Sequence, residues 1–391
     1  MTAVSLRRCL PAVVAALALV LPAACERRDA GGATTTGPIL VGMYGSLTGD
    51  GASFGVSSRE GTELAVDEIN TAGGLLGGRR IQLLVEDDQS RPDEATNAVT
   101  KLITQDRVIA VLGEVASRRS LAAAPVAQRY QVPMITPSST NERVTQVGDY
   151  IFRVCFIDPF QGEVLAKFAY NDLKARRVAI LRDTQEDYSV GLTEAITRVF
   201  TALGGKVLDT VSYSGDDSDF RAALTRIRSL QPDVIMVPGY YLEAAIIVRQ
   251  ARELGLTMPI LGGDGWVGDA LQNGREALNN TYISNHYSGD NPSPVVQTFV
   301  KTYRERFGRE PDSIAALAYD SVKVLVDAIT RAGSTDGQRL RDALATADVT
   351  GVTGQLRMNA QRNVDKPAVI QEVTYANGEV KFVYRTTINP S

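Results

Sequence analysis

The sequence is poor in the residues that catalysis and metal binding use most often. It contains one histidine, His286, and three cysteines. His286 has no nucleophile motif near it, and no GxSxG, HExxH or CxxC pattern occurs anywhere in the chain. We therefore expect His286 to have a structural or rim role, and we expect a protein that is not an enzyme and uses no cofactor or metal. Of the cysteines, only Cys155 lies in the predicted fold, where apolar neighbours predict a buried, inert thiol and no intramolecular disulfide is possible.

The chain also has no excess of basic residues. Its 41 Lys and Arg against 45 Asp and Glu give a formal net charge of −4, with no basic stripe, and this makes nucleic acid a poor candidate for a partner. A hydrophobic content of 44% with 22% charged residues is ordinary for a globular protein. At 391 residues, the chain is long enough that we expect two lobes.

The apolar run at the N-terminus, residues 10–21, is too short to span a membrane comfortably. Arg7 and Arg8 precede it and Pro22-Ala23-Ala24-Cys25 follows it, which is the pattern of an export signal over residues 1–24. Cys25 occupies the place of the lipid-modified cysteine in bacterial lipoproteins, and residues 25–37 have the composition of a flexible tether. Because Pro22 stands where the lipobox prefers Leu, simple cleavage and release is the alternative. We expect a periplasmic or cell-surface protein anchored through Cys25.

The remaining chain alternates strand and helix patterns, which predicts an α/β fold with mostly parallel sheets flanked by helices. We expect strands at 39–43, 80–86, 108–112, 132–135, 151–155, 178–181, 206–211, 234–237 and 259–261. We expect helices at 59–70, 93–105, 119–130, 161–173, 190–203, 219–230, 242–254, 294–307, 314–332 and 337–345. Near the C-terminus, alternating apolar residues on both sides of Asn377-Gly378 predict a β-hairpin that packs on the second lobe.

Two apolar runs within residues 108–140 end in small hydroxyl residues. Ser117 and Ser120 follow the first run, and Thr136, Ser138, Ser139 and Thr140 follow the second. Ligands of open parallel sheets bind at the carboxyl ends of the strands, and hydroxyls with helix N-termini suit a carboxylate. Each Ser could equally cap its own helix. The Gly-rich stretch 45–55 lacks the ending of a phosphate-binding loop and is better explained by a turn that approaches a ligand closely.

An ordered set of short motifs resembles the branched-chain amino acid ABC transporter substrate-binding proteins, the leucine/isoleucine/valine class of type 1 periplasmic binding proteins. The motifs are Gly45-Ser46-Leu47-Thr48-Gly49, Asp67-Glu68-Ile69-Asn70, Gly73-Gly74-Leu75-Leu76-Gly77, Met134-Ile135-Thr136-Pro137-Ser138-Ser139-Thr140 and Gly263-Asp264-Gly265. The resemblance covers essentially the whole mature chain. It implies a two-lobed fold with three hinge crossings, with lobe 1 at 38–154 plus 288–356 and lobe 2 at 155–287 plus 357–388.

The resemblance also implies roles for individual residues. The ligand carboxylate would be held by Ser117, Ser138 and Thr140, and the ligand ammonium by Asp264 and Tyr240. The pocket wall would include Phe54, Tyr188 and Trp266. The implied function is capture of a branched-chain or related amino acid, or a similar zwitterion, by hinge closure, and its delivery to an ABC permease in the membrane by a monomer. The alternatives are the same fold binding a small amide, urea or aromatic acid, or serving as a sensory component.

Overall fold

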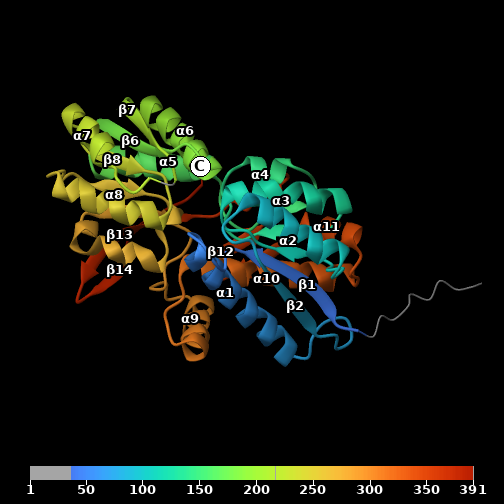
Figure 1. Cartoon of the computed structure of the whole chain (residues 1–391). Helices are drawn as coiled ribbons and strands as arrows, with labels where there is room; N and C mark the ends of the chain where they lie inside the picture. Colours follow the sequence, from blue (N-terminus) through green and yellow to red (C-terminus); the bar gives the residue numbers. More distant parts are fainter. Residues whose placement is uncertain (1–36, 216, 391) are drawn as a thin grey trace, which may run out of the picture. The chain divides into compact units, whose positions relative to one another are not determined.

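The computed structural model describes residues 37–215 and 217–390, which form two large sheets of mostly parallel strands flanked by helices, and one small two-stranded sheet (Figure 1). The α/β fold predicted from the strand–helix alternation is therefore confirmed. The predicted export signal at 1–24, Cys25 and all but the last residue of the predicted tether at 25–37 lie outside the described residues.

The first sheet has five parallel strands in the order β2-β1-β3-β4-β5. They are β1 (Ile39–Gly45), β2 (Ile81–Asp87), β3 (Val111–Leu112), β4 (Met134–Thr136) and β5 (Ile151–Arg153). The helices that connect them are α1 (Ala52–Thr71), α2 (Pro92–Thr104), α3 (Ser117–Tyr130) and α4 (Arg143–Gln146). This order places β3 and β4 side by side, so the loops that follow both strands meet at one edge of the sheet.

The second sheet has seven strands in the order β14-β13-β10-β9-β8-β6-β7. They are β6 (Arg177–Asp183), β7 (Lys206–Tyr213), β8 (Val234–Val237), β9 (Ile260–Gly262), β10 (Thr281–Asn285), β13 (Ala368–Ala376) and β14 (Glu379–Ile388). Its helices include α5 (Asp158–Lys167), which continues as a π-helix at Phe168–Asp172, then α6 (Asp187–Ala202), α7 (Arg221–Leu230) and α8 (Tyr241–Glu253). Short 3-10 segments at Asp264–Trp266 and Asp269–Leu278 follow β9.

Helices from late in the chain pack beside elements from its beginning. The chain leaves β10 through α9 (Pro294–Phe307), α10 (Ser313–Ala332) and α11 (Gly337–Leu344), and returns to β13 through the two-stranded sheet of β11 (Asp348–Gly351) and β12 (Gly354–Arg357). Helix α10 (orange) lies against α1 (blue) in Figure 1. Their contact is close because Gly61 has no side chain: a Cβ there would lie 2.1 Å from the Ala315 carbonyl oxygen.

Several predicted bounds differ from the structure by a few residues, and three differences are larger. Helix α1 begins at Ala52, so the predicted Gly-rich loop ends earlier than residue 55. Gly55 lies inside this helix, where a side chain would not fit, because a Cβ there would lie 2.0 Å from the Ser46 carbonyl oxygen. Strand β10 was not predicted; it has one aliphatic residue, Ile283, and ends in Ser284-Asn285, which are residue types common in loops. The small β11–β12 sheet was missed as well, because each of its strands, DVTG and GQLR, has only one aliphatic residue and contains a glycine. The predicted C-terminal hairpin is confirmed, and β13 joins the second sheet by pairing with β10. The predicted lobe boundaries stay predictions.

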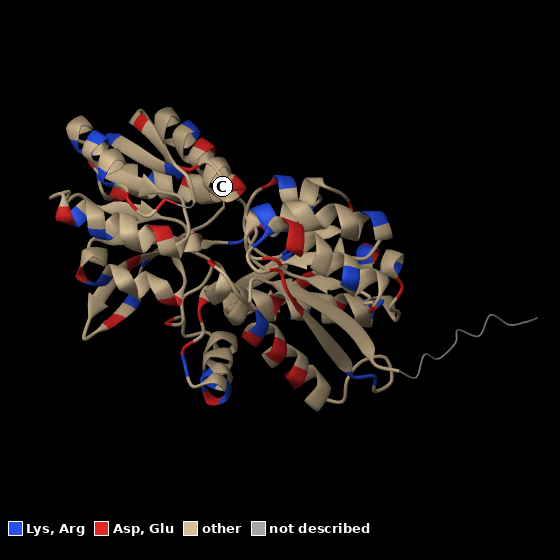
Figure 2. Cartoon of the chain, viewed as in Figure 1, with Lys and Arg blue, Asp and Glu red and all other residues tan. Residues whose placement is uncertain are grey.

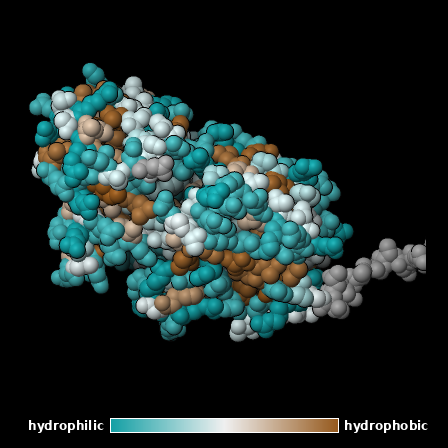
Figure 3. Space-filling view, viewed as in Figure 1, coloured by the Kyte–Doolittle hydropathy of each residue, from teal (hydrophilic) through white to brown (hydrophobic). Residues whose placement is uncertain are grey.

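The described surface has mixed charge and few large apolar side chains. Figure 2 shows basic and acidic residues interspersed over the helices. Hydrophobic atoms in Figure 3 gather in patches between hydrophilic areas, and the large apolar side chains that count as exposed are Tyr130, Val295, Val383 and Tyr384. Over the described part of the chain, no helix is both long and apolar enough to cross a membrane.

Candidate functional site

Seven of the residues predicted for the ligand site line one small cavity of about 10 Å³. It lies where the loops after β3 and β4 meet the loops after β8 and β9. The predicted residues are Phe54, Ser117, Ser138, Thr140, Tyr188, Tyr240 and Asp264, and they are joined by Val115, Gly265 and Ile314. The structure therefore brings together residues that lie more than 200 positions apart in the sequence.

The hydroxyls at the edge of the first sheet fall into two groups. Ser139 and Ser120 lie 2.8 Å apart, hydroxyl to hydroxyl, and both donate to the Glu114 carbonyl oxygen, so they tie the loop after β4 to the loop after β3. Ser138 and Thr140, by contrast, line the cavity. They are joined there by Ser117, the first residue of α3, whose hydroxyl accepts a hydrogen bond from the Asn141 N–H at 3.2 Å. Hydroxyls beside a helix N-terminus suit an anion.

On the opposite side of the cavity lies the buried carboxylate of Asp264, which is 4% exposed. Gln161 donates from Nε2 to its Oδ1 at 2.7 Å, and His286 Nε2 lies 2.8 Å from its Oδ2. Burial lowers the pKa of His286 to about 4, so the imidazole is neutral at pH 7. Asp264 has no Lys or Arg within ion-pair distance among residues 37–215 and 217–390. A buried carboxylate with only neutral partners is costly unless a cation joins it.

The aromatic wall beside Asp264 is built from three rings. Tyr188 and Tyr240 are stacked with centroids 5.3 Å apart, and Phe54 meets Tyr240 edge-on at 5.4 Å. Burial raises the pKa of both tyrosines well above the usual value, so both keep their hydroxyl proton. The Gly265 N–H donates to the Tyr188 hydroxyl at 3.4 Å. The Tyr188 hydroxyl also leaves no room for a side chain at position 263. A Cβ on Gly263 would lie 2.1 Å from the hydroxyl oxygen.

Trp266 does not line this cavity, contrary to the expectation. Its side chain is fully buried in the core of the second sheet, where Nε1 donates to the Val237 carbonyl at 3.1 Å. The ring lies so close to Gly262 that a Cβ there would lie 2.2 Å from it. The 3-10 turn after β9 directs Asp264 toward the cavity and Trp266 into the core.

Sequence reasoning missed a buried charged cluster beside the predicted residues. Glu114, in the loop after β3, forms an ion pair with Arg119 at 3.1 Å and accepts a hydrogen bond from the Ser46 hydroxyl, also at 3.1 Å. The same hydroxyl donates to Asp88 at 2.7 Å. Burial, and then the nearby Glu114 charge, raise the pKa of Asp88 to about 7. Arg119 also lines a second, more polar cavity of about 170 Å³ that shares Phe54 and Tyr240 with the first. The sequence analysis considered Ser117 and Ser120 in this loop but not Glu114, whose partners Ser46 and Arg119 come from other segments.

Gln161 and His286 were missed as partners of Asp264. Gln161 lies in α5 and His286 follows β10, so only the folded chain brings them to the turn after β9. The lone histidine was the available signal, but its position suggested a rim role. No group of three or more His, Cys, Asp or Glu in the described part of the chain could hold a metal ion. The arrangement places hydroxyls, which suit an anion, and the Asp264 carboxylate, which suits a cation, around one cavity.

Comparisons with known proteins show which family the chain resembles as a whole. The family described as periplasmic binding protein matches residues 38–379. A leucine-binding protein of known structure from Thermotoga maritima is 40% identical, with a TM-score of 0.85 and coverage of 90% of this chain and 99% of that one. A branched-chain amino acid transporter substrate-binding protein from Streptococcus pneumoniae, solved in complex with isoleucine, is 34% identical, with a TM-score of 0.83 and coverage of 90% and 100%.

A relative known from its sequence is also a branched-chain amino acid binding protein by name. A Leu/Ile/Val-binding protein of Rhizobium johnstonii is 32% identical over 311 residues, which are 79% of this chain and 83% of that protein. The family match spans most of the chain, and the strands, loops and cavity described above lie almost entirely within it. The chain belongs to the periplasmic binding protein family.

Proposed function

We propose that this protein is the extracytoplasmic solute-binding component of an ABC importer and that it captures a branched-chain amino acid. The observation that carries the proposal is the buried carboxylate of Asp264, which has only neutral partners among the described residues and faces a cavity with hydroxyls on its other side. An α-ammonium supplies the cation that Asp264 needs. The relatives named above bind leucine or isoleucine, or carry names for binding Leu, Ile and Val.

The apolar side chains of the cavity suit an aliphatic ligand. Phe54, Val115 and Ile314 line it together with the rings of Tyr188 and Tyr240. A branched hydrocarbon side chain packed against these groups leaves water, and this contributes roughly 25 cal/mol per Å² of apolar surface buried. The polar ends of the amino acid are then fixed by groups from both sheets: Ser117, Ser138 and Thr140 for the carboxylate, and Asp264 with Tyr240 for the ammonium.

Because each sheet holds one end of the ligand, binding favours closure of the two halves of the protein around it. The carboxylate docks on loops of the first sheet, and the ammonium then contacts Asp264 on the second. Only the closed arrangement makes both contacts, so an amino acid favours it by the difference in contact energy. A closed, ligand-bound monomer would then be the form that an ABC permease recognises. Recognition of the same form by a sensory receptor is the second candidate role, and it makes use of the same site.

The N-terminal segment places the protein outside the cytoplasm in this proposal. Export would remove residues 1–24, and lipid on Cys25 would hold the mature protein at the membrane surface, with residues 25–37 as the tether. Metabolic labelling with a radioactive fatty acid tests the anchor. We expect labelling of the wild type and none of Cys25→Ala, and an unlabelled wild type would show that the protein is released instead.

Calorimetry with leucine and its truncated analogues tests the zwitterion requirement. 4-Methylpentanoate keeps the carboxylate and side chain of leucine but lacks the ammonium, and 3-methylbutylamine keeps the ammonium but lacks the carboxylate. We expect leucine, isoleucine or valine to bind and both analogues to bind at least a hundredfold more weakly, since a buried charge that loses its partner costs about 3–5 kcal/mol. Leucinamide and benzoate represent the amide and aromatic-acid alternatives. Binding of benzoate or an amide without binding of any α-amino acid would refute the proposal.

A further inference from the structure

Two carboxyl groups and one guanidinium are buried together beside the loop that carries Ser117. Asp88 follows β2, Glu114 lies in the loop after β3 and Arg119 lies in α3, and these residues are 0%, 0% and 5% exposed. The Ser46 hydroxyl is within hydrogen-bond distance of both acids, at 2.7 Å from Asp88 Oδ1 and 3.1 Å from Glu114 Oε1. If both acids were ionised, two buried negative charges would face one positive charge, with no further Lys or Arg within ion-pair distance among the described residues.

The Ser46 hydroxyl cannot satisfy both acids in their ionised forms. A hydroxyl has a single hydrogen to donate, and an ionised carboxylate can only accept. If Ser46 donates to one acid, its oxygen faces the other acid with no hydrogen between them. A buried acceptor without a donor is costly, and a charged acceptor costs more. The two contacts of Ser46 are therefore complete only if one of the acids carries a proton.

Glu114 has the donors that an ionised carboxylate needs. Arg119 Nε lies 3.1 Å from its Oε2, and the Ala116 N–H donates to the same oxygen. The Ser46 N–H donates to its Oε1 at 3.3 Å, beside the hydroxyl of the same residue. A nearby cation and backbone N–H donors favour the charged form of a carboxyl group. Glu114 is therefore the ionised member of the pair.

Asp88 has the surroundings of a neutral acid. The Ser90 N–H donates to its Oδ1 at 3.0 Å, but its Oδ2 is buried and has no hydrogen-bond partner among the described residues. Burial, and then the nearby Glu114 charge, raise the pKa of Asp88 to about 7. A proton on Oδ1 can be donated to Ser46, whose own hydrogen is then available for Glu114. Every contact from Asp88 through to Arg119 then has one donor and one acceptor, and the charges cancel.

The other titratable side chains close to Asp88 do not exchange a proton near neutral pH. Tyr44, on β1, keeps its hydroxyl hydrogen because burial raises its pKa well above the usual value. The neighbouring Asp87 stays ionised: burial opposes ionisation, but hydrogen bonds from Thr48, Gln89 and Leu47 lower the pKa of Asp87 below its usual value. Within the described part of this cluster, Asp88 is the group that titrates around pH 7.

The loop that Glu114 holds in place is also part of the amino-acid site. Val115 and Ser117 lie one and three positions after Glu114, and both line the cavity beside Asp264. Loss of the Asp88 proton would place an uncompensated negative charge behind this loop. Ser117 is proposed to bind the ligand carboxylate, and like charges repel each other more strongly in a buried site than in water. Ionisation of Asp88 therefore opposes binding of an amino acid.

We propose that Asp88 carries a proton in the folded protein and loses it as the pH rises above neutral, and that this loss weakens amino-acid binding at the adjoining loop. The protonated acid keeps the chain of contacts to Arg119 neutral, so the loop with Ser117 can accept an anion. The effect on binding rests on the proposed function, because it requires a ligand carboxylate at Ser117. The proton on Asp88 does not rest on it. The protein would then bind its ligand best in neutral or mildly acidic surroundings.

NMR of the protein with ¹³C-labelled Asp carboxyl groups tests the proton without any ligand. The signal that is missing from Asp88→Asn should titrate in the wild type with a midpoint near pH 7. A chemical shift typical of an ionised carboxylate throughout pH 5.5–8.5 would overturn the protonated Asp88.

Two matched amide variants test which acid carries the proton. Asn has the shape of a protonated Asp and can donate an N–H to Ser46, so Asp88→Asn should keep the urea midpoint of the wild type at pH 7. Glu114→Gln makes the same change at the ionised acid and leaves Arg119 buried without its carboxylate, so its midpoint should fall. Failure of Asp88→Asn to fold, or a higher midpoint in Glu114→Gln than in Asp88→Asn, would overturn the assignment.

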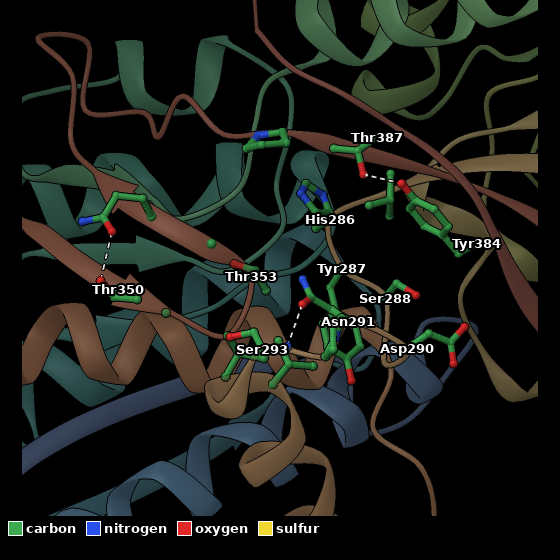
Figure 4. A pocket seen from close by; sticks show the side chains of 18 residues that line it. His286, Tyr287, Ser288, Asp290, Asn291, Ser293, Thr350, Thr353, Tyr384 and Thr387 are labelled. Carbon is green, nitrogen blue, oxygen red and sulfur yellow. Dashed lines mark hydrogen bonds between the residues drawn. The ribbon is translucent and has the colours of Figure 1, made fainter.

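Calorimetry with leucine at pH 6 and pH 8.5 tests the effect on binding. Leucine should bind the wild type about threefold or more weakly at pH 8.5, and this ratio should be smaller in Asp88→Asn. Burial also raises the pKa values of Glu186 and Glu243 to about 7 and lowers that of Lys366 to about 8, but these groups are the same in both proteins. His286, which lines a cavity of about 570 Å³ (Figure 4), stays neutral over this range because burial lowers its pKa to about 4.

The outcomes of the two experiments separate the parts of the proposal. An equal ratio of leucine affinities in the wild type and Asp88→Asn would overturn the coupling. No leucine binding to the wild type at either pH would overturn the coupling together with the proposed function, and the NMR titration would still decide whether Asp88 carries the proton.

Discussion

Replacement of Asp264 by Asn separates the charge of this residue from its size. In the wild type, Gln161 donates to one carboxylate oxygen at 2.7 Å and His286 Nε2 lies 2.8 Å from the other. Asn can still accept from Gln161 through its oxygen, but its NH₂ group then faces His286. The imidazole has to move its hydrogen to Nδ1, which has no partner among the described residues. The variant thus loses the charge and also changes the histidine tautomer.

The expected loss of affinity is large. An amino-acid ammonium in the closed site would face an amide oxygen at most, and loss of one partner of a buried charge pair costs about 3–5 kcal/mol. Leucine should therefore bind to Asp264→Asn roughly a hundredfold to a few thousandfold more weakly in calorimetry. The stability of the ligand-free protein should not fall in the same way. Because a buried carboxylate without a cation is unfavourable, the free energy of unfolding of the ligand-free variant should be equal to or higher than that of the wild type.

This opposition between binding and stability makes the test specific. Urea denaturation of the ligand-free proteins gives the stability, and the same experiment with leucine gives the shift due to binding. Asp269→Asn is a matched control, because Asp269 lies five positions further along but is exposed. Leucine affinity within threefold of the wild type in Asp264→Asn would refute the assignment. A large drop in the stability of the ligand-free protein would instead show that Asp264 is a structural residue.

Four further substitutions test other parts of the structure. Ser138→Ala should weaken leucine without changing the denaturation midpoint, whereas Ser139→Ala should lower the free energy of unfolding by about 1–3 kcal/mol because its hydroxyl joins two buried loops. Burial lowers the pKa of His286 to about 4, so the unfolded state takes up the proton first, and stability should fall by about 3 kcal/mol as the pH drops from 6.5 to 4. In His286→Gln, the free energy of unfolding measured by urea denaturation should not show this fall between pH 6.5 and 4. The same fall in the variant would contradict the assignment. Gly61→Val should cost about 3 kcal/mol, because its Cβ would meet the Ala315 carbonyl oxygen, and a normal melting temperature would show that α1 and α10 separate easily.

Much of the fold could be predicted because its information is local. Long helices have an apolar face and clear ends. For α9 (Pro294–Phe307), the predicted range of 294–307 matches the structure at both ends. The strand β8 (Val234–Val237) is a short apolar run in a parallel sheet and also matches. Strand β10 was missed because its sequence, Thr281–Asn285, has one aliphatic residue and ends in Ser284-Asn285, so no local pattern marks it as a strand.

The site could be predicted only in part, for a related reason. Ser117, Ser138 and Thr140 follow strands that the sequence identifies, and their convergence follows from the order of the sheet. Their assignment to the ligand came from the family resemblance. The partners of Asp264 were not accessible in this way, because Gln161 and His286 come from separate elements whose packing decides which polar groups meet. Trp266 was misplaced because neighbouring residues in a 3-10 turn point in different directions.

The cavity of about 10 Å³ between the hydroxyls and Asp264 has a kinetic consequence. A space of that size holds about one water molecule, so the two halves must separate before an amino acid can enter. Few polar contacts oppose separation at the rim, among them the Tyr241 hydroxyl bonded to the Asp50 carbonyl at 2.5 Å and Arg143 paired with Asp187 at 2.9 Å. Weaker contacts at the rim raise the fraction of open molecules and thus the rate of ligand capture. They also shorten the residence time of the bound ligand. The strength of these contacts therefore sets how fast the protein can load and how long it keeps its ligand.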